Sequence, residues 1–369
     1  MLIVYNSYEG RFSDSPRALY RELAAEGGGH RHVWLADPRF EQHFPPGVET
    51  VRHDAAETVE VLDAADLVIA NVHTPLPWRK RPGAFYLQTW HGTPLKRIHW
   101  DILWAPPGRI GHMSHDVAMW DLLLSPNAAS TPLLRGAFRF SGEVAETGYP
   151  RNDVLVAPDR EAVRARVRRE LGIAPETTAV LYAPTFRDDT VFSPDGRPFA
   201  LELDADRFAD QLGDDHCLLL RLHYFLTDRL EAAARPGVRD VSFHPEISDL
   251  YLAADVLVTD YSSAMFDFAV TGKPIVFYAY DLAHYAGVLR GFYFDFATTV
   301  PGPLLETTQE VIDALRDMPA VTDSYRERYA RFQERFCHLD DGHATRRVLE
   351  RLGLAAEPAG RADSGAGAI

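Results

Sequence analysis

Histidine, serine, arginine and carboxylate side chains stand where several apolar runs of this sequence end. His91 follows the run 84–90 in the stretch TWHGTP, where Gly92 permits a close backbone approach and Pro94 closes the turn. Histidine titrates near neutral pH, so an imidazole at this position can take a proton from an attacking hydroxyl. Trp90 either packs beneath this imidazole or belongs to the core, and we expect the core.

A second group of polar residues lies in the stretch VLVTDYSSAMFD. The strand expected over 256–260 ends at Asp260, and Ser262 and Ser263 then open a helix without an intervening loop. The first amides of a helix lack partners and attract anions, so hydroxyls here predict a phosphate site. Asp267 would lie one turn further along and accept hydrogen bonds from ribose hydroxyls. Taken alone, an N-cap serine and a solvated aspartate are the simpler interpretation.

Two further predicted strands also end in polar residues. Arg221 and His223 stand at i and i+2 and therefore point to the same side of their sheet. A guanidinium beside an imidazole suits a diphosphate, although a lone histidine at a strand end is more often structural. Thr185 and Arg187 occupy another strand end, in APTFRDD. Three such strand ends in one half of the chain favour an anion site over three separate structural explanations.

Short apolar strands alternate with amphipathic helices, a pattern typical of parallel sheets covered on both faces. The first series consists of 2–5, 15–26, 32–36, 58–66, 67–71 and 84–90. The second series consists of 160–172, 179–185, 217–223, 256–260 and 274–280. We predict an α/β chain with two doubly wound domains, 1–157 and 158–353, and a ligand in the cleft between them.

Segments outside the strand ends complete this organisation. Arg151 and Asn152, in ETGYPRND just before the link between the domains, either reach a ligand or form a turn. A helical stretch is expected over 322–353, and its aromatic stripe predicts packing across the back of the protein. Residues 354–369 carry too little apolar surface to offset their ordering entropy, so we expect a disordered tail.

Composition excludes several classes of protein. The 369 residues include 38 Lys and Arg against 53 Asp and Glu, a formal charge of −15 that argues against nucleic acid as a partner. No run reaches the roughly 18 apolar residues of a membrane span, and the N-terminus lacks the features of a secretory signal, so we expect a cytoplasmic protein. Cys217 and Cys337 give neither a disulfide framework nor a metal-ligand spacing. Basic clusters at 79–81 and 96–97 could meet an anionic lipid or a phosphorylated substrate.

Several of these segments together resemble a known family, the CDP-glycerol glycerophosphotransferases, which are teichoic acid primases and polymerases. The matching segments occur in the family's order from about residue 5 to about residue 340. This agreement is far more specific than a single motif. They are QTWHGTPLK, LLSPN, GYPRNDVL, LYAPTFRDD, RLHY, ISDLYLAADVLVTDYSS, FDFA and YDLAHYAGVLRGFYFDF.

The resemblance implies a GT-B type fold, with two Rossmann-like domains facing across a cleft and the nucleotide on the C-terminal one. It implies that His91 and His223 are catalytic and that an acceptor hydroxyl attacks the phosphorus bearing glycerol, releasing CMP. Which histidine is the base stays open. The expected donor-binding residues are Thr185, Arg187, Arg221, Asp260, Ser262, Ser263 and Asp267. The residues expected at the acceptor or the cleft are Gly92, Thr93, Lys96, Arg151 and Asn152.

The implied partners are a CDP-activated polyol, with CDP-glycerol as donor, and a lipid-linked or polymer acceptor. No covalently bound cofactor is expected. The sequence shows no tight carboxylate cluster for magnesium, so metal use stays open. Peripheral contact with the inner face of the plasma membrane is compatible with this reaction. Polymerases of the family commonly carry an additional N-terminal region, whereas this chain starts almost directly at its first predicted sheet, which puts processive polymerisation in doubt.

Three alternatives remain at this point. The donor could be CDP-ribitol, because no motif in the sequence distinguishes glycerol from ribitol. A glycosyltransferase or epimerase of GT-B architecture could use a sugar nucleotide, since a fold permits many chemistries. A nucleotide-binding protein without activity would fit less well, because both histidines, Arg221 and the serine pair are present.

Overall fold

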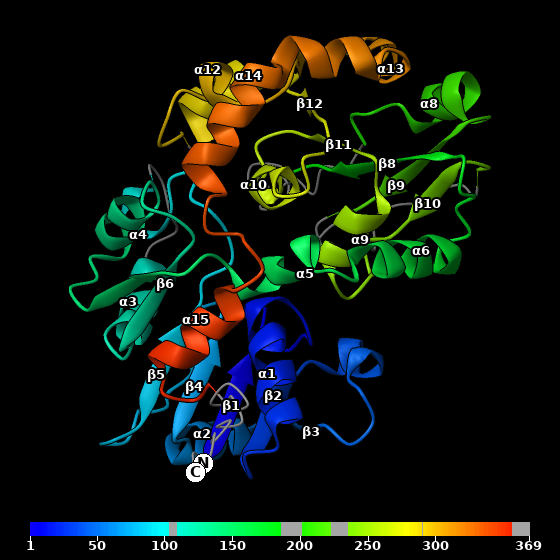
Figure 1. The fold of residues 1–369 in the computed structure, drawn as a ribbon. Helices are drawn as coiled ribbons and strands as arrows, with labels where there is room; N and C mark the ends of the chain where they lie inside the picture. Colours follow the sequence, from blue (N-terminus) through cyan, green and yellow to red (C-terminus); the bar gives the residue numbers. More distant parts are fainter. Residues whose placement is uncertain (103–108, 186–200, 223–234, 290, 356–369) are drawn as a thin grey trace, which may run out of the picture.

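The computed structural model of the chain describes residues 1–102, 109–185, 201–222, 235–289 and 291–355. Within these ranges the strands form two separate sheets, each packed against helices (Figure 1). All pairings between named strands are parallel in the part of the chain that is described. The predicted α/β class is therefore confirmed.

The two sheets have the same kind of strand order. The first sheet runs β3-β2-β1-β4-β5-β6-β7 and the second runs β10-β9-β8-β11-β12-β13. The first contains β1 Leu2–Asn6, β2 Arg31–Ala36, β3 Glu49–Arg52, β4 Leu67–Ala70, β5 Phe85–Gln88, β6 Leu122–Ser125 and β7 Glu143–Glu146. The second contains β8 Thr178–Ala183, β9 His216–Leu220, β10 Val238–Asp240, β11 Val256–Thr259, β12 Ile275–Tyr278 and β13 Leu304–Leu305.

In both sheets the order reverses beside the first strand, which is the doubly wound arrangement of Rossmann-like folds. The reversal lies between β1 and β4 in the first sheet and between β8 and β11 in the second. Ligands of such sheets bind outside the carboxyl ends of the strands at this point. The residues that follow β1, β4, β8 and β11 are therefore the first places to look for a site.

Helices of the first half are α1 Asp14–Glu26, η1 Pro38–His43, α2 Ala56–Ala64, η2 His99–Asp101, α3 Arg109–Val117, α4 Thr131–Phe138, η3 Pro150–Asn152 and α5 Asp153–Val156. Those of the second half are α6 Arg160–Glu170, α8 Ala205–Leu212, α9 Ile247–Ala253, α10 Ala264–Ala269, α11 Leu282–His284, η5 Tyr285–Leu289, α12 Phe296–Thr299, α13 Thr308–Arg316, α14 Met318–Phe336 and α15 Ala344–Arg351.

Both faces of the first sheet are buried at its centre, which explains why β1, β4 and β6 are almost entirely apolar. Val4 and Val68 belong to one core cluster, whereas Ile3, Tyr5 and Ile69 belong to another. Neighbouring residues of a strand point to opposite faces, so each face has a core of its own.

The chain passes between the two halves twice. The first passage is η3 and α5, and the second is the segment 337–343 between α14 and α15 (Figure 1). The passages touch at Gly148, whose φ is 73° and whose ideal Cβ would lie 2.7 Å from the carbonyl oxygen of Leu339. No side chain fits there, so this glycine allows the two segments to cross.

The end of the chain differs from the sequence prediction. The helical stretch expected over 322–353 is broken after α14, and Gly342 in the break has a φ of 85°. Val348 and Leu349 of α15 then join the core cluster of Ile3 in the first sheet. Residues from 344 on, which we assigned to the second domain, thus pack on the first, because α15 has an apolar face that the second sheet does not cover.

The first two residues of the expected disordered tail, 354–369, pack against the first half instead. Leu354 and Ala355 pack against the same cluster of the first sheet, and residues 356–369 lie outside the described part of the chain. None of the helices in the described ranges combines the length and the apolarity that crossing a membrane requires.

We predict that α15 contributes to the stability of the first half. Leu349→Ala deletes a side chain that is 1% exposed and should lower the free energy of unfolding by about 2–5 kcal/mol. Arg346→Ala, on the exposed face of the same helix, should change it by less than about 0.5 kcal/mol. Urea denaturation measures both, and equal effects of the two substitutions would contradict the packing of α15.

Candidate active site

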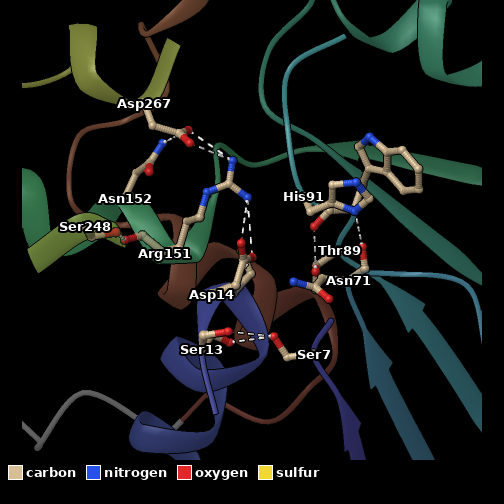
Figure 2. Close-up of polar contacts among 12 residues, drawn as sticks. Ser7, Ser13, Asp14, Asn71, Thr89, His91, Arg151, Asn152, Ser248 and Asp267 are labelled. Carbon is tan, nitrogen blue, oxygen red and sulfur yellow. Dashed lines mark hydrogen bonds and ion pairs between the residues drawn. The ribbon is translucent and has the colours of Figure 1, made fainter. Parts of the chain in front are cut away.

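His91 lies just beyond the carboxyl end of β5, next to the reversal point of the first sheet. The strand ends at Gln88 because Trp90 takes a left-handed backbone conformation, with a φ of 54°. The imidazole Nδ1 lies 2.6 Å from the carbonyl oxygen of Asn71, the residue that follows β4 (Figure 2). Trp90 is buried in the first core, as expected, and its ring centroid is 4.1 Å from that of His91.

The surroundings of His91 keep its imidazole neutral. Burial lowers the pKa of His91 to about 4, and Arg151 and His73 also lower it, against the hydrogen bond to Asn71 and the charge of Asp14, which raise it. A carbonyl can only accept, so the hydrogen bond to Asn71 assigns the proton to Nδ1. Nε2 is then left with a lone pair at neutral pH, which is the state that a general base requires.

Across the interface the turn after β5 meets the start of α10 in the second half. An ideal Cβ on Gly92 would lie only 2.8 Å from Oγ of Ser263. The two polar segments that the sequence analysis singled out therefore lie against each other. Glycine at position 92 is required by this close approach rather than by its backbone angles, because its φ is not positive.

A buried arginine joins the two halves beside this contact. Arg151 in η3 is 4% exposed and donates from Nη1 to Asp14 at 3.3 Å and from Nη2 to both carboxylate oxygens of Asp267 at 3.0 Å (Figure 2). The guanidinium also lies 4.2 Å above the ring of Tyr149. Asp14 and Asp267 hold the pKa of Arg151 above its usual value against the effect of burial.

This cluster gives three predicted site residues another environment. Arg151 and Asn152 were expected to reach a ligand or to form a turn, and they do lie in a turn, η3. Asp267 was expected to face a ribose, but both of its oxygens accept from Arg151, and one also accepts from Asn152 at 3.0 Å. The helix pattern predicted which face of α10 carries Asp267. It could not show that the guanidinium of Arg151, which is distant in the sequence, already binds this carboxylate.

Asp340 adds a third carboxyl group to the same cluster, from the segment between α14 and α15. Nδ2 of Asn152 donates to Oδ1 of Asp340 at 3.0 Å, in addition to its bond to Asp267. Burial and the nearby charge of Asp267 raise the pKa of Asp340 to about 7, although Asn152 and Arg151 oppose the shift. Close to neutral pH this group therefore gains or loses a proton inside the folded protein.

Most of the residues predicted to bind the donor lie at the reversal point of the second sheet. Oδ1 of Asp260 accepts from the backbone N–H of Thr185 at 2.8 Å, so it ties the end of β8 to the end of β11. The hydroxyl of Ser262 accepts from the backbone N–H of Ala264 at 3.2 Å. Helix α10 has only six residues, so the argument from its dipole is weaker than the sequence pattern suggested.

Arg221 directly follows β9, and Arg11 adds a second positive charge near it. Its Nη1 donates to the backbone carbonyls of Val241, Ser242 and His244. Burial and the charge of Arg11 lower the pKa of Arg221 to about 10, so it stays positive at neutral pH. A small pocket between the two halves opens nearby, lined by Arg11, Phe12, Phe40, His43, Phe243, His244 and Pro245.

The remaining predicted residues lie around the turn after His91 or outside the described part of the chain. Thr93 is buried, and Lys96 pairs with Phe292 in an isolated antiparallel bridge that also joins the two halves. Arg187 and His223 belong to segments that the structure does not describe. In the described ranges no three His, Cys, Asp or Glu side chains gather as a potential metal centre.

Sequence reasoning missed three residues around His91. Asn71, Asp14 and Tyr8 all contribute to its surroundings, through a hydrogen bond, a charge and a ring 5.5 Å away. For Tyr8 and Asp14 one signal was the stretch SYEGRFSDSP, at residues 7–16, which also looks like the start of the family but assigns no roles. Asn71 directly follows an apolar strand, and this position was available as a signal.

Comparison with known proteins identifies the chain. Residues 1–354 match the family described as CDP-Glycerol:Poly(glycerophosphate) glycerophosphotransferase. The chain belongs to this family. The resemblance read from the sequence is thereby confirmed.

Relatives in the family differ in length. A teichoic acid poly(glycerol phosphate) polymerase of Bacillus spizizenii is 36% identical over 95% of this chain and 91% of its own length. A teichoic acid glycerol-phosphate transferase of Staphylococcus aureus is 37% identical over 95% of this chain and 92% of its own. Against a poly(glycerol phosphate) polymerase of Staphylococcus epidermidis, 35% identical, the match covers 94% of this chain and 49% of the relative, so the chain spans about half of that protein.

Solved structures agree on the fold. The wall teichoic acid polymerase TagF, in a form soaked with CDPG, superposes with a TM-score of 0.88 at 34% identity, over 95% of this chain and 88% of the other. The GT-B type arrangement is thus confirmed. UDP-GlcNAc 2-epimerase of Neisseria meningitidis, at 12% identity and a TM-score of 0.56 over 96% of this chain and all of the other, shares the fold alone.

We predict that Gly92→Ala disrupts the site without unfolding the chain. The added methyl group would meet Ser263 at 2.8 Å, so the turn of His91 and the start of α10 must separate. Because a small misplacement of reacting groups is costly, kcat/KM should fall at least about tenfold. Gly136→Ala in α4, where a Cβ would meet nothing within 4 Å, is the matched control and should retain full activity.

We also predict a pH-dependent gain in stability from Asp340→Asn. The pKa of Asp340 is higher in the folded chain than in the unfolded one, so its stabilising contribution is present at acid pH and is lost as the pH rises through about 7. The difference in free energy of unfolding between the variant and the wild type should therefore shift in favour of the variant by about 2 kcal/mol as the pH rises from 5 to 8. Urea denaturation at both pH values measures this, and a constant difference would refute it.

Proposed function

We propose that this chain transfers glycerol phosphate from CDP-glycerol to a hydroxyl group of a cell-wall polymer acceptor and releases CMP. The observation that carries the proposal is the contact of the His91 turn with the Ser263 helix start, in a chain of the glycerophosphotransferase family. This contact brings a neutral imidazole next to the segment expected to hold the donor diphosphate. We further propose a lipid-linked acceptor and peripheral contact with the inner face of the plasma membrane.

The proposed step breaks one phosphorus–oxygen bond and forms another. Nε2 of His91 accepts the proton of the acceptor hydroxyl while the oxygen attacks the phosphorus that bears glycerol. The bond from this phosphorus to CMP breaks, and CMP leaves with the bonding electrons. Arg221 supplies positive charge on the donor side, and the family resemblance assigns a second catalytic histidine to His223 and a further cation to Arg187.

The serine hydroxyls before α10 complete the proposed donor site. Ser262 and Ser263 are partly exposed, so their hydroxyls are accessible to a diphosphate. For Asp267 we do not retain the contact with ribose, since its carboxylate binds Arg151. Thr185 and Asp260 shape the adjacent strand ends, and Gly92, Thr93 and Lys96 form the turn that faces them.

The two enzymatic alternatives are weaker. Relatives named for glycerol phosphate are 36% and 37% identical to this chain, whereas a poly(ribitol-phosphate) polymerase of Bacillus spizizenii is 29% identical over 75% of it. The epimerase shares only its fold with this chain, and a shared fold does not determine the substrate. CDP-glycerol is therefore the donor we propose.

We predict that the purified chain releases CMP from CDP-glycerol in the presence of a lipid-linked glycerol phosphate acceptor. His91→Ala should lower kcat by at least about a hundredfold, since general base catalysis contributes that much. His115→Ala, an exposed histidine on α3, should leave kcat unchanged. Mass spectrometry of the product with CDP-glycerol, CDP-ribitol and a UDP-sugar in parallel identifies the donor. Faster turnover of either other donor, or full activity of His91→Ala, would overturn the respective assignment.

A further inference from the structure

Several residues in the stretch 8–14, and Trp90 next to His91, hold their backbone in a left-handed conformation that residues other than glycine usually avoid. Tyr8, Glu9, Asp14 and Trp90 have φ values of 45°, 57°, 62° and 54°. Such residues persist only where the surrounding structure fixes them, and they concentrate at functional sites. Tyr8 and Glu9 lie in the loop from β1 to α1, and Asp14 begins α1; the proposed mechanism uses none of these three.

We infer that Tyr8, Asn71 and Asp14 are positioning residues that orient His91 and make its orientation depend on the ion pairs of Arg151 between the two halves. This inference rests on the proposed function, because it takes His91 as the base. It concerns residues that touch neither the donor nor the acceptor in the proposed step.

The first link joins His91 to the loop after β1 through Asn71. The carbonyl oxygen of Asn71 accepts from the imidazole Nδ1 at 2.6 Å, and its side-chain Oδ1 accepts from the backbone N–H of Tyr8 at 2.9 Å. Asn71 is completely buried. One rigid residue therefore holds both the ring of His91 and the backbone of Tyr8, and the two aromatic rings lie 5.5 Å apart.

The second link joins Tyr8 to the ion pairs. The Tyr8 hydroxyl donates to Oδ2 of Asp14 at 3.1 Å, and the same carboxylate accepts from Nη1 of Arg151. Charge-assisted hydrogen bonds of this kind are stronger than neutral ones, so the position of Asp14 determines where the Tyr8 hydroxyl can lie.

The second half of the chain holds Asp14 in two ways, indirectly through Arg151 and directly through Glu246. Arg151 binds Asp14 on one side and Asp267 of α10 on the other. Glu246, which directly precedes α9, accepts from the backbone N–H of Asp14 at 3.0 Å and pairs with Arg17 at the same distance. If the two halves separate, Asp14 loses its contact with Glu246 and Arg151 loses its contact with Asp267. The path through Tyr8 and Asn71 to His91 then loses its support from the second half.

The groups that face His91 come from four different parts of the chain. Asp14 at the start of α1 raises the pKa of His91, whereas Arg151 in η3 and His73 after β4 lower it. Tyr8 adds a neutral ring, because burial and Asp14 keep the pKa of its hydroxyl high. Removing the charge of Asp14 should therefore make the imidazole harder to protonate, whereas Asp267 is on the far side of Arg151.

The decisive experiment uses Tyr8→Phe in the full chain, which deletes one hydroxyl and keeps the ring. We expect kcat for CMP release from CDP-glycerol to fall about tenfold, with KM for CDP-glycerol within about twofold, because the orientation of His91 changes and the donor contacts do not. The lost hydrogen bond to Asp14 should also lower the melting temperature by a few degrees. The matched control is Tyr5→Phe, which deletes a buried hydroxyl bound to His32 on the other face of the sheet and should retain full activity.

A second experiment measures the titration of the His91 imidazole directly. In nuclear magnetic resonance spectra of nitrogen-labelled protein, the His91 signal, assigned with His91→Ala, should titrate at a lower pH in Asp14→Asn than in the wild type. Asp267→Asn removes the other carboxylate of Arg151 and should leave this titration in place.

The outcomes separate the two proposals. Wild-type kcat in Tyr8→Phe together with an unshifted titration in Asp14→Asn would overturn the positioning role, even if His91→Ala is inactive. Full activity of His91→Ala would instead remove the proposed base, whatever the other variants show. A lower melting temperature with unchanged kcat in Tyr8→Phe would assign the hydroxyl to stability alone.

Discussion

A charge that is removed from water must be matched by opposite charge nearby, and in this protein that requirement applies to Arg151. Its guanidinium is almost completely buried and is held by Asp14 from the first half and Asp267 from the second. Removing one partner of such a pair leaves an unpaired buried charge, which is much more costly than losing a surface pair. These ion pairs therefore tie the two halves together beside His91.

The same constraint explains the close approach of the two polar segments. With α10 fixed through Asp267, Ser263 reaches the turn after β5, and only glycine fits at position 92. The second passage of the chain, past Gly148, and the bridge from Lys96 to Phe292 hold the halves together at other points. A general base and a donor site that belong to different domains need this kind of fixed relation before chemistry can occur.

Family membership and the geometry of the site provide separate support for the proposed chemistry. The family match extends over residues 1–354 and bears on the reaction class, whereas the contacts bear on what individual residues do. A poly(glycerol phosphate) polymerase matched over 91% of its own length also shows that the length of this chain does not set it apart from polymerases. Our expectation that the short start disfavours polymerisation therefore has no support from the comparison.

The sequence by itself determined the α/β class, the two series of strands and the polar strand ends, because side-chain periodicity and apolar runs are local properties. Only the tertiary structure decided which polar residues meet. Asp267 and Arg151 are separated by 115 intervening residues, and no local pattern shows that they neutralise each other. The same holds for α15, whose apolar face fits either sheet by pattern and packs on the first. Long-range charge pairing and packing depend on how the whole chain is arranged, and that arrangement appears only in three dimensions.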